Sequence, residues 1–283
     1  MTLNASSVVG GQPVTATVQM NGSASLSDSI LITLTTDDPT SVTIPASVFL
    51  NGGTAAIQVA TRVVPNTRTV TITATSGGQA RSATLTLQPP TIATVAANPT
   101  STISPSTVPV TVTLTAPLPS ATTATVACTG QGLTCPTSVS LSGSTASFNV
   151  TTSDVPTART GTITVTFNGV ATSGTLDIQP LAVESMIVSP ATIRAGVSSS
   201  FTMQLNRAST TGLTFSFASS DPTVVFAPAA VTFTAGQITK LVTINSAAPQ
   251  SVSKTVTITA TANRSTPFGT SVITKTATIA VNP

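Results

Sequence analysis

Hydrophobic and polar residues alternate along most of this chain with a period of two. In residues 69–75, Val70, Ile72 and Ala74 alternate with threonines. A period of two places the two sets of side chains on opposite faces of a β-strand. Threonine is β-branched, which suits a pleated sheet and disfavours a helix. The pattern therefore predicts a strand with one apolar face and one threonine face.

This strand is the first half of a predicted hairpin that occurs three times. In the second copy the dipeptide Asn168-Gly169 separates the two strands, and it is a strong signal for a two-residue hairpin turn. The third copy has a longer loop, around residues 263–274. A proline ends each copy, and because proline cannot donate a ladder hydrogen bond, we expect the strand to stop there. The copies span residues 68–90, 160–180 and 254–283.

Each hairpin closes one of three sequence repeats, which predicts domains at residues 1–89, 90–180 and 181–283. Each repeat contains about seven or eight short strand patterns with turn signals between them, as in an immunoglobulin-type antiparallel β-sandwich. The predicted fold is all-β, with three tandem Ig-like domains arranged end to end. The proline joints are short, so we expect a rod with limited bending. The predicted core of the first domain is Val14, Val18, Ile32, Leu34, Ile57, Val59, Val70, Ile72, Leu85 and Leu87.

The repeat pattern is also specific enough to compare with a known family. Strand and turn motifs at residues 7–18, 45–48, 53–57 and 69–75 carry the comparison. They resemble the bacterial immunoglobulin-like repeats of cell-surface and secreted proteins. The antibody-type Cys…Trp…Cys pattern is missing, since the chain has no Trp. The resemblance implies stalks, adhesins, accessory domains of extracellular enzymes or phage structural proteins.

Composition changes this picture in one respect, which is the scarcity of charge. Only 6% of the 283 residues are charged, against roughly 25% in an ordinary soluble domain. The net charge of +3 comes from ten Lys and Arg, which are scattered singly, against seven Asp and Glu. Nucleic-acid binding uses clustered basic residues and aromatic platforms, so we expect no nucleic-acid partner. Self-association is favoured, because uncharged surfaces repel one another weakly.

Two further features concern the cellular location. No run approaches the roughly 18 apolar residues of a transmembrane helix, so we expect no membrane insertion. The first residues lack the basic and apolar regions of a signal peptide. Two interpretations fit this start: a mature form or fragment of an exported protein, or a virion component made in the cytoplasm.

Cys128 and Cys135 are the only cysteines and lie in one loop, where Gly130 and Gly132 allow the chain to turn. The alternatives are a local disulfide and two reduced thiols. A metal site needs more ligands, and the chain has no His to add. We favour the disulfide, since the low charge and the Ig-like repeats suggest an extracellular setting.

Acidic residues in the loops invite a comparison between calcium binding and turn chemistry. Asp37, Asp38 and Asp221 lie in equivalent loops before a proline, where an Asp side chain caps a turn. Asp177 and Glu184 flank the second joint, but two carboxylates are few for an ion that takes six to eight oxygen ligands. We therefore interpret the loop acids as turn residues and predict no metal.

Catalysis is not expected either. Without His there is no imidazole base, Glu184 is the only Glu, and Asp154 is interpreted as a loop residue. Lys240, Lys254 and Lys275 could form a Lys–Asn cross-link, but they are interpreted as exposed strand positions. The sequence predicts no catalytic residue, no cofactor and no small-molecule substrate.

The favoured function is a structural module that spaces or assembles an extracellular object, such as a stalk, sheath or filament. A phage decoration or tail protein and an adhesin stalk remain as alternatives. Partners are expected to be other copies or other structural proteins that pair with sheet edges. Residues 2–4 and 276–281 are the predicted donor strands for such pairing.

Overall fold

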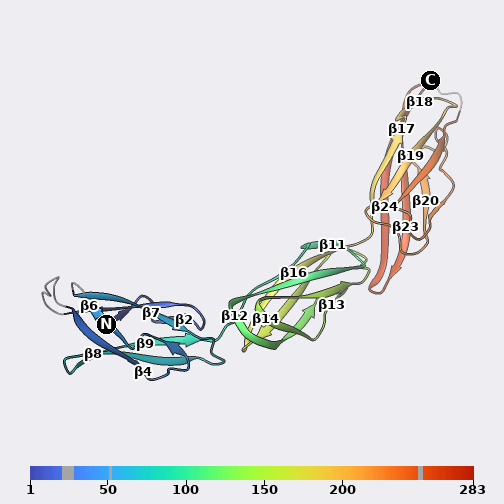
Figure 1. The fold of residues 1–283 in the computed structure, drawn as a ribbon. Coiled ribbons are helices and arrows are strands. Elements are labelled where there is room, and N and C mark those ends of the chain that lie inside the picture. Colours follow the sequence, from blue (N-terminus) through green and yellow to red (C-terminus); the bar gives the residue numbers. More distant parts are fainter. Residues whose placement is uncertain (21–28, 51–52, 248–250) are drawn as a thin grey trace.

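The chain folds into three successive β-sandwiches. The computed structural model describes residues 1–20, 29–50, 53–247 and 251–283. Three separate clusters of buried apolar side chains follow the sequence, from Val14 to Leu87, from Ile92 to Ile178 and from Leu181 to Val281. The sandwiches lie end to end in Figure 1. The predicted all-β tandem fold is confirmed, and none of the described residues belongs to a helix that could cross a membrane.

The first domain packs a sheet of strand order β1-β3-β7-β5 against a sheet of order β2-β9-β8-β4-β6. Every predicted core residue of this domain is buried in the cluster between the two sheets. The strands are β1 (Thr2–Leu3), β2 (Ser7–Val9), β3 (Val14–Gln19), β4 (Ile30–Thr36), β5 (Val42–Thr43), β6 (Ser47–Leu50), β7 (Thr54–Thr61), β8 (Arg68–Ser76) and β9 (Gln79–Gln88).

In the second domain two long strands belong to both layers. The first part of β12 pairs with β10, its last part pairs with β15, and β14 accompanies it along both parts. The register shifts between Thr113 and Thr122, where the chain passes from one layer to the other. The strands are β10 (Ile92–Ala97), β11 (Ser101–Ile103), β12 (Ser106–Thr129), β13 (Leu133–Thr134), β14 (Ser138–Thr152), β15 (Arg159–Phe167) and β16 (Val170–Gln179).

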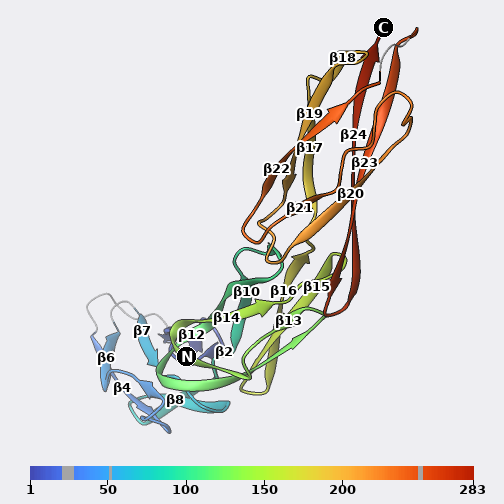
Figure 2. The ribbon, with the colours of Figure 1, turned by 90° about the vertical axis from the view of Figure 1, so that its right-hand side faces the viewer.

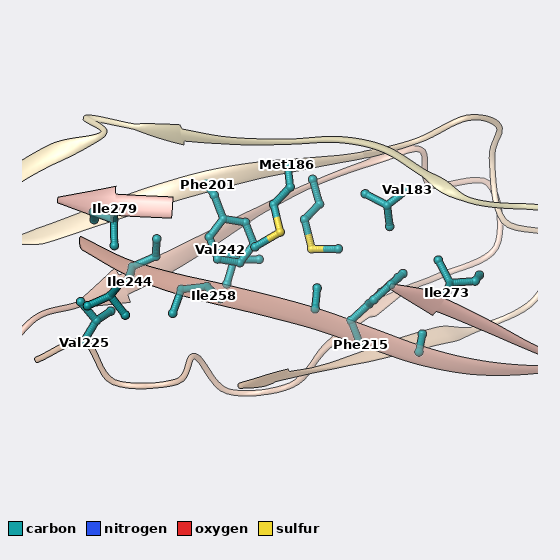
Figure 3. Close-up of a cluster of buried hydrophobic side chains, with 14 of the residues drawn as sticks. Val183, Met186, Phe201, Phe215, Val225, Val242, Ile244, Ile258, Ile273 and Ile279 are labelled. Atoms are coloured by element: carbon teal, nitrogen blue, oxygen red, sulfur yellow. The ribbon is translucent and has the colours of Figure 1, made fainter. Parts of the chain in front are cut away.

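The third domain has the same plan, with a sheet β17-β19-β22 facing a sheet β18-β24-β23-β20-β21. Phe201, Phe215 and Phe233 are fully buried in its core. Figure 3 shows Phe201 and Phe215 among the side chains between the sheets. The strands are β17 (Val183–Ser189), β18 (Thr192–Arg194), β19 (Ser198–Leu205), β20 (Leu213–Ser219), β21 (Val231–Phe233), β22 (Thr239–Asn245), β23 (Lys254–Thr266) and β24 (Gly269–Asn282).

The repeated hairpin forms as its sequence predicts. Asn168 and Gly169 both have positive φ, 50° and 75°, which is the backbone of a type I′ turn. Along β8, Val70, Ile72 and Ala74 are buried while the threonines face outward. One of these threonines forms a hydrogen bond to the next strand, between Thr73 Oγ1 and Ser82 Oγ at 2.8 Å.

The third hairpin differs from its prediction. The expected loop at residues 263–274 is a continuation of the strands, and only Pro267 and Phe268 form the turn. As a result β23 and β24 have 13 and 14 residues, against 9 and 10 in β15 and β16. The alternation does continue through this segment, but Arg264 occupies an inward position and hides the apolar pattern.

Both predicted donor strands are already paired inside their own domains. Thr2 and Leu3 lie opposite Thr17 and Ala16 of β3. Residues 276–281 pair with β23 over their whole length. These backbone pairs lie within the chain, and pairing of either strand with another copy stays a prediction.

Replacing Phe215 with alanine should lower the free energy of unfolding of the third domain by about 3–5 kcal/mol. Phe215 is fully buried and its ring centroid lies 5.7 Å from that of Phe233. Hydrogen exchange of third-domain amides under denaturant measures the change. The matched control is Phe226→Ala, because Phe226 is 51% exposed and should change stability by less than about 0.5 kcal/mol. Equal losses for the two variants would contradict this placement of the core.

Candidate functional site: three loops and a joint

The loops that follow β4, β12 and β20 are equivalent, and each domain fastens its loop in a different way. In the first domain the carboxylate of Asp38 accepts hydrogen bonds from the hydroxyl and N–H of Thr40 and from the hydroxyl of Ser41 at 2.6 Å. It also pairs with Arg68, at the start of β8, at 3.0 Å. The hydroxyl of Ser41 and then that of Thr40 hold the pKa of Asp38 well below its usual range. Asp38 is thus a turn residue that ties the loop to the next strand.

The third domain repeats this arrangement. Asp221 accepts a hydrogen bond from Thr223 and pairs with Lys254, at the start of β23, at 3.0 Å. The Thr223 hydroxyl and Lys254 lower the pKa of Asp221. Asp37 accepts a bond from the Thr71 N–H at 2.8 Å. Each loop acid therefore has partners within its turn or a neighbouring strand. The described residues bring together no group of three His, Cys, Asp or Glu side chains suited to a metal ion.

In the second domain a disulfide takes the place of the acid. Thr129 lies seven residues before Pro136. Asp38 and Asp221 lie seven residues before Pro45 and Pro228 in their domains, so the three positions are equivalent. Beside Thr129, Cys128 and Cys135 are joined, with 6.0 Å between their Cα atoms. Both cysteines are partly buried against the second core. A local disulfide of this kind restricts the unfolded loop and fastens this loop covalently.

The ring that the disulfide closes lies tightly against its neighbours. Gly130 and Gly132 both have positive φ, 111° and 82°. A Cβ atom on Gly130 would lie 2.9 Å from the Gly161 Cα, and one on Gly132 would lie 2.6 Å from a methyl carbon of Val155. The Gly132 carbonyl accepts a hydrogen bond from the Ser153 N–H at 2.8 Å. The loop is therefore attached to the residues immediately before Asp154.

Asp154 is the centre of the joint between the second and third domains. Its Oδ1 atom accepts a bond from Arg207 Nη2 at 2.8 Å, and its Oδ2 atom pairs with Arg264 Nη2. The side chains of Asp154, Arg207 and Arg264 are 17%, 15% and 8% exposed, so water screens these pairs weakly. One carboxylate of the second domain thus holds two guanidinium groups of the third.

Arg207 reaches further into the second domain. Its Nε atom donates to the Ser104 carbonyl oxygen at 2.7 Å. Burial lowers the pKa of Arg207, Asp154 opposes this shift and Arg264 adds to it. The joint therefore combines ion pairs with a main-chain hydrogen bond, which fixes orientation as well as distance.

The long third hairpin supplies a further contact. Figure 2 shows the β23–β24 hairpin extending beside the strands of the second domain. At its tip, a ring carbon of Phe268 lies 3.7 Å from where a Gly132 Cβ would stand. The tip therefore rests on the loop that carries the disulfide.

The other residues singled out from sequence are not brought together. Asp177 accepts a bond from Thr160 at 2.7 Å, and Glu184 accepts one from Gln204 at 3.2 Å. Lys254 pairs with Asp221, and Lys275 donates to the Glu184 carbonyl. These contacts are local and give no metal or catalytic arrangement among the residues described.

Sequence reasoning missed the joint. Asp154 was interpreted only as a loop residue, and Arg207 and Arg264 were not singled out. The available signal was Arg264 at an inward position of a long alternating strand. Nothing in the sequence showed that this position faces another domain.

Comparisons with known proteins give a likeness of fold. No protein-family model matches the chain, and no curated protein matches it. Invasin, a bacterial integrin-binding protein, is 17% identical with a TM-score of 0.40 over 99% of this chain and 60% of its own. Domains A168–A170 of titin are 14% identical with a TM-score of 0.37, covering 99% and 95% of the two chains. The D0–D1 domains of intimin are 14% identical with a TM-score of 0.27, covering 62% and 96%.

The chain thus spans 60% of the length of the invasin chain that it matches. These proteins contain bacterial immunoglobulin-like domains or tandem immunoglobulin domains. The similarity lies in the architecture, which is a series of all-β sandwiches.

Asp38→Asn should remove a stabilising contribution that depends on pH. The pKa of Asp38 is lower in the folded chain than in the unfolded one, so its contribution is fully present above about pH 4, the unfolded value. The contribution shrinks as the pH falls below that value towards the folded pKa. Melting of both proteins between pH 7 and pH 2 measures the difference. A difference that grows on acidification would contradict the assignment.

Asp154→Asn should weaken the joint more than Arg264→Gln does. Loss of the carboxylate leaves two neighbouring cations without a counter-charge, whereas loss of Arg264 leaves the pair between Asp154 and Arg207 intact. We expect a cost of about 1–3 kcal/mol for Asp154→Asn, below the 3–5 kcal/mol of fully buried pairs. Hydrogen exchange of the joint segments in the full chain reports the change. Equal effects of the two substitutions would refute the central role of Asp154.

Proposed function

We propose that this chain is a non-enzymatic structural module. Its Ig-like domains form a rod that spaces or assembles an extracellular surface structure, such as a stalk, sheath or filament. The joint at Asp154 carries the proposal, because it holds one sandwich at the end of the next through side chains of both. Such a contact keeps two ends apart, which is the task of a spacer.

Two other features support an extracellular setting. The disulfide between Cys128 and Cys135 belongs to the kind that persists in oxidising compartments. Charged residues are only 6% of the chain, so copies packed closely together repel one another weakly.

Contacts between copies belong to the same proposal. On the outer face of the sheet β17-β19-β22, the register aligns Ile187, Thr202 and Leu241 in one row. Ile187 and Leu241 are 63% and 68% exposed. The row offers apolar area for packing against a neighbouring structural protein or another copy.

Small-angle scattering of the purified chain tests the spacer function. A compact globule of 283 residues would have a radius of gyration of about 19 Å. We expect a clearly larger value and the profile of an elongated particle at low concentration. A radius near the compact value would reject the rod.

A second arm of the same test concerns location and assembly. Antibody labelling of intact producing cells should detect the chain from outside, and a concentration series should show growth into larger particles. Labelling only after permeabilisation would contradict the extracellular assignment while leaving the rod itself standing.

A further inference from the structure

We infer that the two joints of the rod differ in kind: the second is fixed by a seat built on the Cys128–Cys135 disulfide, and the first is compliant. The seat consists of residues 130–132 and 153–154. This inference rests on the proposed function for its biological meaning, since it says where the spacer is stiff and where it bends. Its physical basis is a comparison of equivalent positions at the two joints.

A pair of equivalent residues beside the two joints shows the first difference. Thr115 and Asn206 are equivalent, because the side chain of each accepts a 3.0 Å bond from a main-chain N–H just after its joint, Thr91 and Ala182 respectively. The next residue is Ala116 in the second domain and Arg207 in the third. Of these two equivalent positions, only the one in the third domain therefore carries a guanidinium.

The opposite side of each joint shows the second difference. Val63 in the first domain and Asp154 in the second each precede a Val-Pro dipeptide before the repeated hairpin. Val64 and Val155 of these dipeptides are both buried. The first joint thus has an apolar side chain where the second has the carboxylate that binds two arginines.

The hairpins of the second and third domains differ in length. Each strand of the third hairpin is four residues longer than its counterpart in the second, which extends the hairpin by about 13 Å. The longer hairpin brings Arg264 and Phe268 to the second domain. The shorter one ends at Asn168, whose side chain donates to the Pro90 carbonyl of the linker at 2.8 Å. Within the described part of the chain, no side-chain hydrogen bond or ion pair links residues 1–89 to residues beyond Pro90.

The disulfide encloses residues 130–132 of the seat. It closes the ring that carries Gly132, and the Gly132 carbonyl holds the N–H of Ser153, next to Asp154. Phe268 of the third domain rests on the same glycine. The first and third domains fasten this loop with Asp38 or Asp221, whereas Thr129 offers no carboxylate. The covalent bond is therefore the element that keeps the seat in place.

The charges make the seat sensitive to small displacements. Two guanidinium groups share one carboxylate, and the buried Arg264 Nε has no hydrogen-bond partner among the described residues. A shift of Asp154 would leave like charges facing each other in a poorly solvated joint, where their repulsion is strong. A loop that holds Asp154 in one position thereby fixes the orientation of the whole third domain.

Pulsed electron–electron spin distances in the full chain test this inference. Non-cysteine spin labels are placed at Thr84, Thr175 and Thr278, which are equivalent exposed positions of β9, β16 and β24. We expect a narrow distance distribution between positions 175 and 278 and a broad one between 84 and 175. Equally broad distributions across the two joints in the unmodified chain would overturn the inference.

The variant that tests the disulfide is Cys128→Ser combined with Cys135→Ser. It should convert the narrow 175–278 distribution into a broad one and leave the 84–175 distribution unchanged. An unchanged 175–278 distribution would show that the disulfide plays no part in the seat. Circular dichroism and hydrogen exchange establish whether the second domain remains folded in this variant.

Phe268→Ser keeps the inference testable if the cysteine variant fails to fold. It removes the ring from the seat without changing the second domain, and it should broaden the 175–278 distribution alone. The matched control is Val272→Ser, on the same hairpin, where the side chain is 64% exposed and the distribution should stay narrow. Identical results for Phe268→Ser and Val272→Ser would refute the role of the tip. A failed joint still leaves an elongated particle in scattering, so the two proposals fail separately.

Discussion

The carboxylate of Asp154 is the constraint on which the architecture depends. Each sandwich has its own buried core, so hydrophobic burial explains three separate domains and does not orient them. Orientation requires directional contacts between domains, and the ion pairs of Asp154 with Arg207 and Arg264 provide them. The bond from Arg207 to the Ser104 carbonyl adds a third direction. Three of the few charged residues of this chain therefore lie together at the joint between the second and third domains.

The three domains also show how one scaffold accommodates different chemistry. The same loop is held by Asp38 with Arg68, by Cys128 with Cys135, and by Asp221 with Lys254. The acid pairs are partly exposed, so their strength depends on pH and salt. The disulfide depends on neither, and it occurs in the domain whose loop also supports a neighbour. Covalent fastening therefore coincides with the position where displacement would affect another domain.

Much of the fold could be predicted because the alternation of apolar and polar residues is regular. Val70, Ile72 and Leu85 are buried as the period of two requires, and Asn168-Gly169 adopts the predicted turn. Within the third hairpin, residues 263–274 are predicted as a loop, and the inward Arg264 interrupts the apolar series there. In a single sandwich an inward arginine would be unfavourable, and only the carboxylate of another domain makes the position acceptable.

The joint could not be predicted for a related reason. Alternation reports which face of a strand is buried, but it does not report what covers the end of a sandwich. Asp154 lies in an irregular segment between β14 and β15, where no periodicity exists to interpret. Its partners lie 53 and 110 residues further along the chain. Contacts of this separation depend on the complete arrangement of two domains.

The most direct test of this account is the measurement of residual dipolar couplings for the backbone amides of the full chain in a dilute aligned medium. Each domain then yields its own alignment tensor, and domains that move as one body share a tensor. The account predicts one common tensor for the second and third domains and a different, smaller one for the first. Three unrelated tensors, or one tensor shared by all three domains, would contradict it.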